Sequence, residues 1–268
     1  MRGIERVIEA GKVMEVQRYL APRLGKRGRG SPPEGQESES SKRAHLKRAE
    51  ARLRWTLNEN FEDGKDALVT LSWKKADAPK NSEDMKRRVA NFLKRLKRRY
   101  RKAGKELKYI YTLEVGPKGS RHVHMVISDA DLKELQESWE KGQIVNIVPL
   151  NSGGQYAGIA SYFVKYAQKT EETEGRKVGQ LYNPSRNLRK PRITVRVIYR
   201  TRFKEPQERK GWGIDRDHTS YGVREDGSPY QEITYIRQEA GERKKGKWQT
   251  QKRRSYSKNS GSSDPPKS

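Results

Sequence analysis

Residues 108–128 read KYIYTLEVGPKGSRHVHMVIS, and this stretch decides the fold of the chain. Two runs rich in β-branched and aromatic residues, 108–115 and 121–128, flank the short segment GPKGS, which is a strong hairpin signal. Because side chains alternate across a strand, Val123 and Ile127 share an apolar face with their neighbours two residues away. The stretch therefore predicts an antiparallel hairpin with one core-facing side and one polar side.

The flanking sequence extends this hairpin into a larger unit. ALVTLSW (67–73) predicts a strand, and the apolar stripe of residues 82–103 predicts a helix. A short helix through Trp139, capped by Asp129, and a strand over 143–150 follow. The order β-α-β-β-α-β predicts an α+β, ferredoxin-like fold, a four-stranded antiparallel sheet with helices on one face. A further helix is expected over 156–169, after Gly153-Gly154.

The two ends of the chain differ from this middle in composition. Residues 1–24 show weak helical spacing, 25–41 read as a disordered Gly/Ser/Pro linker, and 42–61 read as a basic helix. A strand is expected over 192–199 and an accessory hairpin over 224–236. We therefore predict four segments: an N-terminal extension with linker (1–44), a folded domain (45–205), an accessory hairpin region (206–239) and a disordered basic tail (240–268).

The charge balance points to a polyanionic partner. The 268 residues include 60 Lys and Arg against 34 Asp and Glu, a net charge of +26, and only 31% hydrophobic residues. Nucleic acid is the expected partner, since neutralised phosphates release counterions. A soluble basic protein, or one that adsorbs to acidic membranes, is the alternative. The absence of cysteine excludes disulfides, thiolate zinc sites and cysteine nucleophiles, and no apolar run is long enough to span a membrane.

The densest basic run lies on the predicted helix 82–103. A solvated helix face is the ordinary interpretation of such a run, but acidic residues are nearly absent from it, which favours binding to the phosphate backbone. Trp55, Trp212, Trp248 and Tyr221 could stack on unpaired bases or pack in the protein. The candidate DNA-binding residues of the helix are Lys94, Arg95, Lys97, Arg98, Arg99, Arg101 and Lys102.

The polar face of the hairpin carries a candidate metal site. If Val115 faces Arg121 across the turn, then Glu114 faces His122, and His124 lies on the same face two residues further along. Two imidazoles and a carboxylate form a plausible open site for a divalent cation. The alternative is a pair of ordinary hydrogen-bonded histidines.

The predicted helix 156–169 carries a candidate nucleophile. Tyr162 and Tyr166 are four residues apart and share a helix face, as do Lys165 and Lys169. A tyrosine hydroxyl forms covalent intermediates when it is activated, and a nearby lysine stabilises the developing negative charge. Taken alone, the pattern is equally that of two packing aromatics beside solvated lysines.

These motifs resemble those of a known enzyme family. His122-Val-His124 looks like the HUH motif, with Glu114 as the preceding acidic ligand. The doubled Tyr-x-x-Lys of Tyr162 and Tyr166 resembles the two-tyrosine helix of rolling-circle replication initiators from small single-stranded DNA phages. ALVTLSW is similar to their first strand motif, and YNPSRNL (182–188) to a segment in related phage and plasmid initiators. The resemblance covers roughly residues 45–200.

The resemblance implies a sequence-specific nicking and joining enzyme that uses Mg²⁺ or Mn²⁺. A tyrosine attacks single-stranded origin DNA, a 5′-phosphotyrosine link forms, and the free 3′-hydroxyl primes replication. Tyr166 is the expected first nucleophile and Tyr162 the second. Because no GxxxxGK[ST] motif is present, unwinding would need a host helicase with the host replication machinery, in the cytoplasm of a bacterial host.

Three alternatives remain open at this point. A relaxase for plasmid transfer or a single-strand transposase would use the same chemistry. A non-catalytic RNA-binding module would share the β-α-β-β-α-β order, although histidines stand where its stacking aromatics are expected. A basic structural or packaging protein would need neither His122, His124 nor Tyr166.

Overall fold

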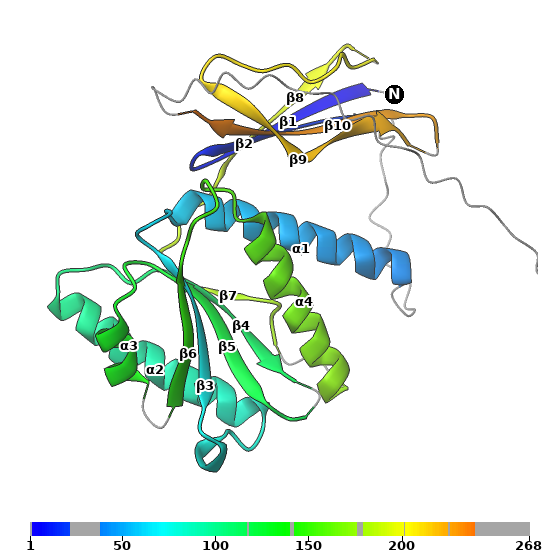
Figure 1. Ribbon diagram of the computed structural model, residues 1–268. Helices are drawn as coiled ribbons and strands as arrows, with labels where there is room; N and C mark the ends of the chain where they lie inside the picture. The colour runs from blue at the N-terminus through cyan, green and yellow to red at the C-terminus, as the bar shows by residue number, and fades with distance from the viewer. Residues whose placement is uncertain are drawn as a thin grey trace, which may run out of the picture. The chain divides into compact units, whose positions relative to one another are not determined.

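The computed structural model describes residues 2–21, 38–116, 118–139, 142–175, 179–200, 202–224 and 226–238. Within these ranges the chain forms two antiparallel five-stranded sheets and four α-helices (Figure 1). None of these helices is both long and apolar enough to cross a membrane. Most of the predicted linker over 25–41, Trp248 and the predicted tail over 240–268 lie outside the described residues.

The first sheet has the strand order β6-β3-β5-β4-β7, and every neighbouring pair is antiparallel. With α2 between β3 and β4 and α3 between β5 and β6, this is the ferredoxin-like order, so the α+β prediction is confirmed. The edge strand β7 was not predicted. The strands are β3 (Ala67–Trp73), β4 (Tyr109–Val115), β5 (Arg121–Ile127), β6 (Gly142–Pro149) and β7 (Asn183–Pro184).

Helices α2 (Ser82–Lys102) and α3 (Leu132–Ser138) cover one face of this sheet (Figure 1). The apolar stripe of α2 packs on Val123, Met125 and Ile127 of β5, as the alternation predicted. The expected cap of α3 is wrong by two residues. The carboxylate of Asp131 accepts the hydrogen bond from Glu134 N at 2.9 Å, whereas Asp129 adopts a left-handed backbone with φ +46°.

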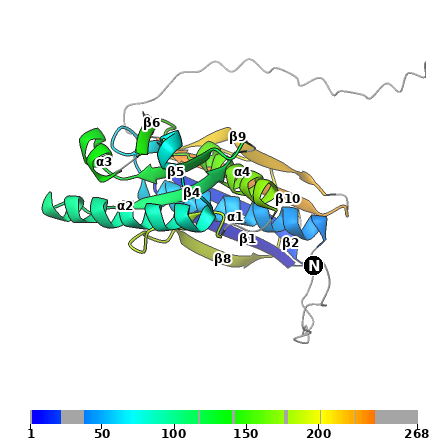
Figure 2. The same cartoon turned by 90° about the horizontal axis from the view of Figure 1, so that it is seen from below.

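The opposite face is covered by α1 (Glu39–Asn60) and α4 (Ala157–Glu174), so the sheet lies between two helical layers (Figure 2). Leu53 of α1 and Phe163 of α4 are fully buried against Ile110 and Val126 of the sheet. Helices on one face therefore describe α2 and α3, and the second layer is an addition. It forms because α1 and α4 each carry an apolar stripe that the alternate side chains of β4 and β5 complete.

The second sheet has the order β8-β1-β2-β10-β9, and it overturns the helical prediction for residues 1–24. These residues form a hairpin whose strands are paired on both sides, β1 with β8 and β2 with β10. Long-range pairing outweighs the weak local spacing, because each strand gains two ladders of backbone hydrogen bonds. The strands are β1 (Arg2–Ala10), β2 (Val13–Ala21), β8 (Arg192–Ile198), β9 (Trp212–Val223) and β10 (Pro229–Arg237).

Two further predictions change with this sheet. The strand expected over 192–199 is present as β8, but it pairs with β1 rather than with the first sheet. The hairpin expected over 224–236 is only the turn and second strand of a larger one, since β9 begins at Trp212. The segment 1–44, predicted as an extension, thus supplies two central strands.

The turn between β1 and β2 packs against the end of α1. Gly11 has φ +58°, and a Cβ there would lie 2.0 Å from the carbonyl oxygen of Asn58, so only glycine fits. Beside it, Arg54 Nε and Trp55 Nε1 donate to the Glu15 carboxylate at 2.7 and 2.8 Å. Trp55 is therefore a buried packing residue and is not available to stack on bases.

A buried carboxylate joins three strands of the second sheet. Glu5 of β1 is 3% exposed and accepts hydrogen bonds from Arg18 Nε of β2 at 2.6 Å and Arg196 Nε of β8 at 2.7 Å. Burial alone would raise the pKa of Glu5, but the two guanidinium groups outweigh burial and hold the pKa below its usual value. The ionised form is thus favoured in the folded state.

Replacing this carboxylate is expected to destabilise the fold. Glu5→Gln should lower the free energy of unfolding by roughly 1–3 kcal/mol at pH 7, because it leaves two partly buried guanidinium groups without a charged partner. Since the pKa of Glu5 is lowered on folding, its contribution is present above the unfolded pKa and is lost as the pH falls through the folded pKa.

Urea unfolding at pH 7 and at successively lower pH measures both effects. Glu9→Gln is the matched control on the same strand, since Glu9 pairs with Arg192 at the exposed surface, where a pair contributes about 0–1 kcal/mol. Equal midpoints for the two variants at pH 7 would contradict the assignment.

Candidate functional site

The β4–β5 hairpin brings the three predicted metal ligands together. The register pairs Glu114 with His122 and Thr112 with His124, as the sequence predicted. Glu114 Oε2 lies 2.7 Å from His124 Nε2 and 3.4 Å from His122 Nδ1. Glu114 and His124 are buried, whereas the His122 side chain is 32% exposed. The cluster therefore opens toward solvent on the His122 side.

The Glu114 carboxylate is held in its ionised form. Burial raises the pKa of Glu114, but hydrogen bonds from His122 and His124 act in the opposite sense and bring the pKa to about 2. Lys169 Nζ adds a third positive group, 3.9 Å from Glu114 Oε1. An ionised carboxylate accepts hydrogen bonds only, so His124 Nε2 must carry the proton that it shares with Glu114.

The donor set fits a divalent cation in chemical type, because imidazoles and carboxylates are common ligands of such ions. In the arrangement described, the carboxylate binds the imidazoles instead, and within the described ranges no group of three His, Cys, Asp or Glu side chains is placed to hold an ion. Cation binding at Glu114, His122 and His124 would therefore require the carboxylate to turn away from the rings.

Helix α4 presents both candidate tyrosines to the same side of the sheet as the histidines. The hydroxyl of Tyr162 lies 3.1 Å from His124 Nδ1. The ring centres of Tyr162 and Tyr166 lie 5.0 and 4.9 Å from that of His124, and 4.3 Å from each other. Phenol, imidazole and carboxylate thus share one group of side chains, the tyrosine cluster.

The environment keeps the Tyr162 phenol protonated. Burial raises its pKa, and the neighbouring Tyr166 and the negative Glu114 raise it further. With His124 Nε2 bound to Glu114, Nδ1 of a neutral ring is free to accept the Tyr162 proton. Thr70 Oγ1 of β3 lies 3.2 Å from the same nitrogen and completes its surroundings. Sequence analysis missed Thr70, although it faces His124 in the β3–β5 register.

The two lysines of the helix lie differently. Lys169 Nζ lies 5.7 Å from the centre of the Tyr166 ring and near Glu114, so its charge reaches the cluster. Lys165 is exposed on the neighbouring side of the helix. Of the two, Lys169 is placed to influence charge at the tyrosines.

A threonine that the sequence did not reveal positions α4 on the sheet. Thr170 Oγ1 accepts from Val115 N at 2.9 Å and donates to Leu113 O at 3.1 Å, so one side chain joins the helix to β4. At the other end, Tyr156 N donates to Asn58 Oδ1 and Tyr156 OH donates to Asp63 Oδ1, both at 2.9 Å. No local pattern distinguishes these residues, because their partners are 55 to 98 residues away.

The predicted DNA-binding residues of α2 lie on the sheet face opposite the histidines and divide into three groups. Arg95 Nε donates to Ser138 O at 2.9 Å, and Arg99 pairs with Glu137, so these two join α2 to α3. Arg98 and Lys102 are exposed. The remaining cations line a groove beside β4: Lys94, Lys97 and Arg101.

Comparison with known proteins gives one match. Residues 66–171 match the family of the replication-associated protein ORF2. The match spans β3 to α4 and so contains the carboxylate, both histidines and both tyrosines. It supports a role in replication initiation, with DNA as partner. No curated protein and no solved structure matches the chain.

The Thr170 clamp is expected to contribute to stability. Thr170→Val keeps the shape of the side chain but leaves Val115 N–H and Leu113 C=O without a partner, which should lower the free energy of unfolding by about 1–3 kcal/mol. Thr173→Val is the control, since the Thr173 hydroxyl bonds only Lys169 O in its own helix at the surface. That change should stay within about 0.5 kcal/mol. Thermal unfolding of both variants decides the point, and equal losses would refute the clamp.

Proposed function

We propose that this chain is a site-specific single-stranded DNA nicking and joining enzyme that starts rolling-circle replication through a tyrosine nucleophile. The match to the replication-associated family supports the role in initiation. The observation that carries the chemistry is the contact between the tyrosines of α4 and the His124–Glu114 pair of the hairpin. A packing role alone does not need two hydroxyls beside an ionised carboxylate and an imidazole.

The proposed step is a transesterification. A tyrosine oxygen attacks the phosphorus of the scissile phosphodiester and forms a Tyr–O–P bond, and the bond from phosphorus to the 3′-oxygen breaks. The phenol gives up its proton, and the departing oxygen gains one to become the 3′-hydroxyl. The product is a 5′-phosphotyrosine link plus a primer end. Attack of a 3′-hydroxyl on this link reverses the step and joins the strand, so no oxidant or reductant is required.

The residues of the cluster take separate roles in this proposal. Tyr166 attacks first, and Tyr162, whose hydroxyl is engaged by His124 Nδ1, acts in the second transfer. The Lys169 ammonium, near both the Tyr166 ring and Glu114, stabilises the negative charge that builds on the phenol and phosphoryl oxygens. Lys165 is proposed to contact the phosphate chain from its exposed position.

Glu114, His122 and His124 are proposed to hold Mg²⁺ or Mn²⁺. When bound, such a cation polarises the phosphoryl group as a Lewis acid. Unwinding is assigned to a host helicase, since the sequence has no P-loop, and primer extension to the host replication machinery in the bacterial cytoplasm.

Cleavage of labelled single-stranded origin DNA tests the nucleophiles. With Mn²⁺, the unaltered chain should form a covalent protein–DNA species, and the variant carrying Tyr162→Phe and Tyr166→Phe should form none. Tyr166→Phe should slow the first cleavage by on the order of 100-fold or more, whereas Tyr162→Phe should cleave and fail in the second transfer. Tyr199→Phe is the control, because Tyr199 is 99% exposed. Normal nicking by the double variant would overturn the proposal.

Direct metal binding tests the ligands independently of cleavage. Titration of the chain with Mn²⁺, followed by electron paramagnetic resonance of the free ion, should give one site that Glu114→Gln weakens by at least about tenfold. Glu137→Gln, which removes a carboxylate near α2 and α3, should leave the affinity unchanged. Equal Mn²⁺ affinity in Glu114→Gln and the unaltered chain would exclude the assigned ligand set.

A further inference from the structure

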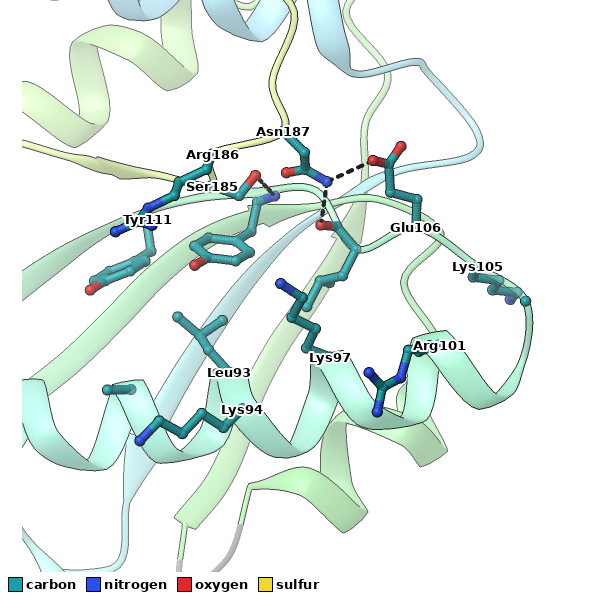
Figure 3. Close-up of a pocket in the computed structure, with 14 residues that line it drawn as sticks. Leu93, Lys94, Lys97, Arg101, Lys105, Glu106, Tyr111, Ser185, Arg186 and Asn187 are labelled. Carbon is teal, nitrogen blue, oxygen red and sulfur yellow. Dashed lines mark hydrogen bonds between the residues drawn. The ribbon is translucent and has the colours of Figure 1, made fainter.

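A groove of about 890 Å³ lies on the sheet face opposite the tyrosines (Figure 3). One wall is α2, the floor is the first half of β4, and the other wall is the segment 185–187 after β7. Alternation along β4 separates this groove from the tyrosine cluster, since Tyr109 and Tyr111 face α2 while Glu114 faces α4. The groove is therefore a second site on the same strand.

The floor of the groove is aromatic. Tyr109 and Tyr111 are both partly exposed, with ring centres 6.1 Å apart and ring planes inclined by 33°. Leu93 of α2 lies across from them (Figure 3). Such a surface offers flat apolar area to a planar ring, which is the property that stacking platforms for unpaired bases share.

The rim of the groove is cationic. Glu106 is an acidic side chain of the lining, and Asn187 Nδ2 holds it at 3.0 Å. Lys86, Arg87 and Arg99 of α2 are paired with acidic side chains, whereas none of the rim cations has such a pair within the described ranges. The rim cations are Lys94, Lys97, Arg101, Lys105 and Arg186.

The wall opposite α2 is fixed in place by backbone contacts. Ser185 and Tyr109 exchange two hydrogen bonds, Ser185 N to Tyr109 O at 2.8 Å and Tyr109 N to Ser185 Oγ at 3.2 Å. Asn187 Nδ2 also donates to Leu107 O at 3.0 Å (Figure 3). Arg186, between these two anchors, is thus held beside Tyr111 at the rim, and the groove needs little rearrangement to accept a ligand.

We propose that this groove binds a second segment of single-stranded DNA, with a base stacked on Tyr111 and Tyr109 and the phosphates on the cationic rim. The combination of aromatic floor and unpaired cations matches an unpaired strand, because duplex DNA keeps its base faces stacked and inaccessible. The choice of DNA as the nucleic acid rests on the proposed function. The site itself is separate from the nicking chemistry, since it shares no side chain with the tyrosine cluster.

Equilibrium binding without cleavage tests the rim. Fluorescence anisotropy with a labelled 20-nucleotide strand, the full chain and EDTA should show that Lys94→Gln with Lys97→Gln weakens binding by about tenfold or more. The slope of log affinity against log salt should fall by about 1.4, because two phosphates of a single strand are no longer neutralised. Arg98→Gln with Lys102→Gln is matched in helix and in charge, and it should change affinity by less than about twofold. Equal weakening by the two pairs would overturn the proposal.

The floor is tested by substitutions that separate stacking from polarity. Tyr111→Leu should weaken binding by about fivefold or more, whereas Tyr111→Phe should bind as the unaltered chain does. A strand carrying 5-bromodeoxyuridine should crosslink on irradiation to the peptide containing Tyr109 and Tyr111. Crosslinks confined to other peptides would exclude the groove.

The two proposals fail separately. The groove assays use EDTA and can be repeated in the chain carrying Tyr162→Phe and Tyr166→Phe, so they do not depend on nicking. If the groove variants bind normally while Mn²⁺-dependent cleavage is intact, only the groove proposal fails. If the tyrosine variants still nick while the groove variants lose affinity, only the nicking proposal fails.

Discussion

The pairing of Glu114 with His122 across the β4–β5 hairpin is the constraint on which the rest of the site depends. Side chains alternate along both strands, so a slip of one residue would send the carboxylate and both imidazoles into the core under α2. The buried face of the same strands excludes that slip, because Val123, Met125 and Ile127 would then face the α4 side. Core packing and the polar cluster therefore select one register together.

The site exists because a helix from a different part of the chain is held against that hairpin. Thr170 joins the C-terminal half of α4 to β4, and Tyr156 joins its beginning to the end of α1. Between these anchors, the i, i+4 spacing places Tyr162 and Tyr166 on one face beside His124. The anchors use hydrogen bonds that are buried, where an unsatisfied partner is costly, and this fixes the helix more firmly than apolar contact alone.

One strand organises both faces of the domain. β4 directs Glu114 toward α4 and Tyr109 and Tyr111 toward α2, so the tyrosine cluster and the cationic groove share a rigid support. The cations of α2 divide accordingly. Arg95 and Arg99 are used to hold α3, and those nearest β4 are left for a ligand. Charge density alone does not make this division, which depends on which acidic groups reach the helix.

The sequence by itself determined the hairpin, its register, the ferredoxin-like order and the residues that meet in the cluster, because alternation and helical spacing are local properties that long-range contacts did not override here. Only the tertiary structure decided the N-terminal hairpin, the second helical layer, the roles of Thr70 and Thr170 and the aromatic floor at Tyr109 and Tyr111. Each of these depends on partners distant in the chain. Residues 2–10 become a strand by pairing with residues about 190 positions away, a contact that no local pattern encodes.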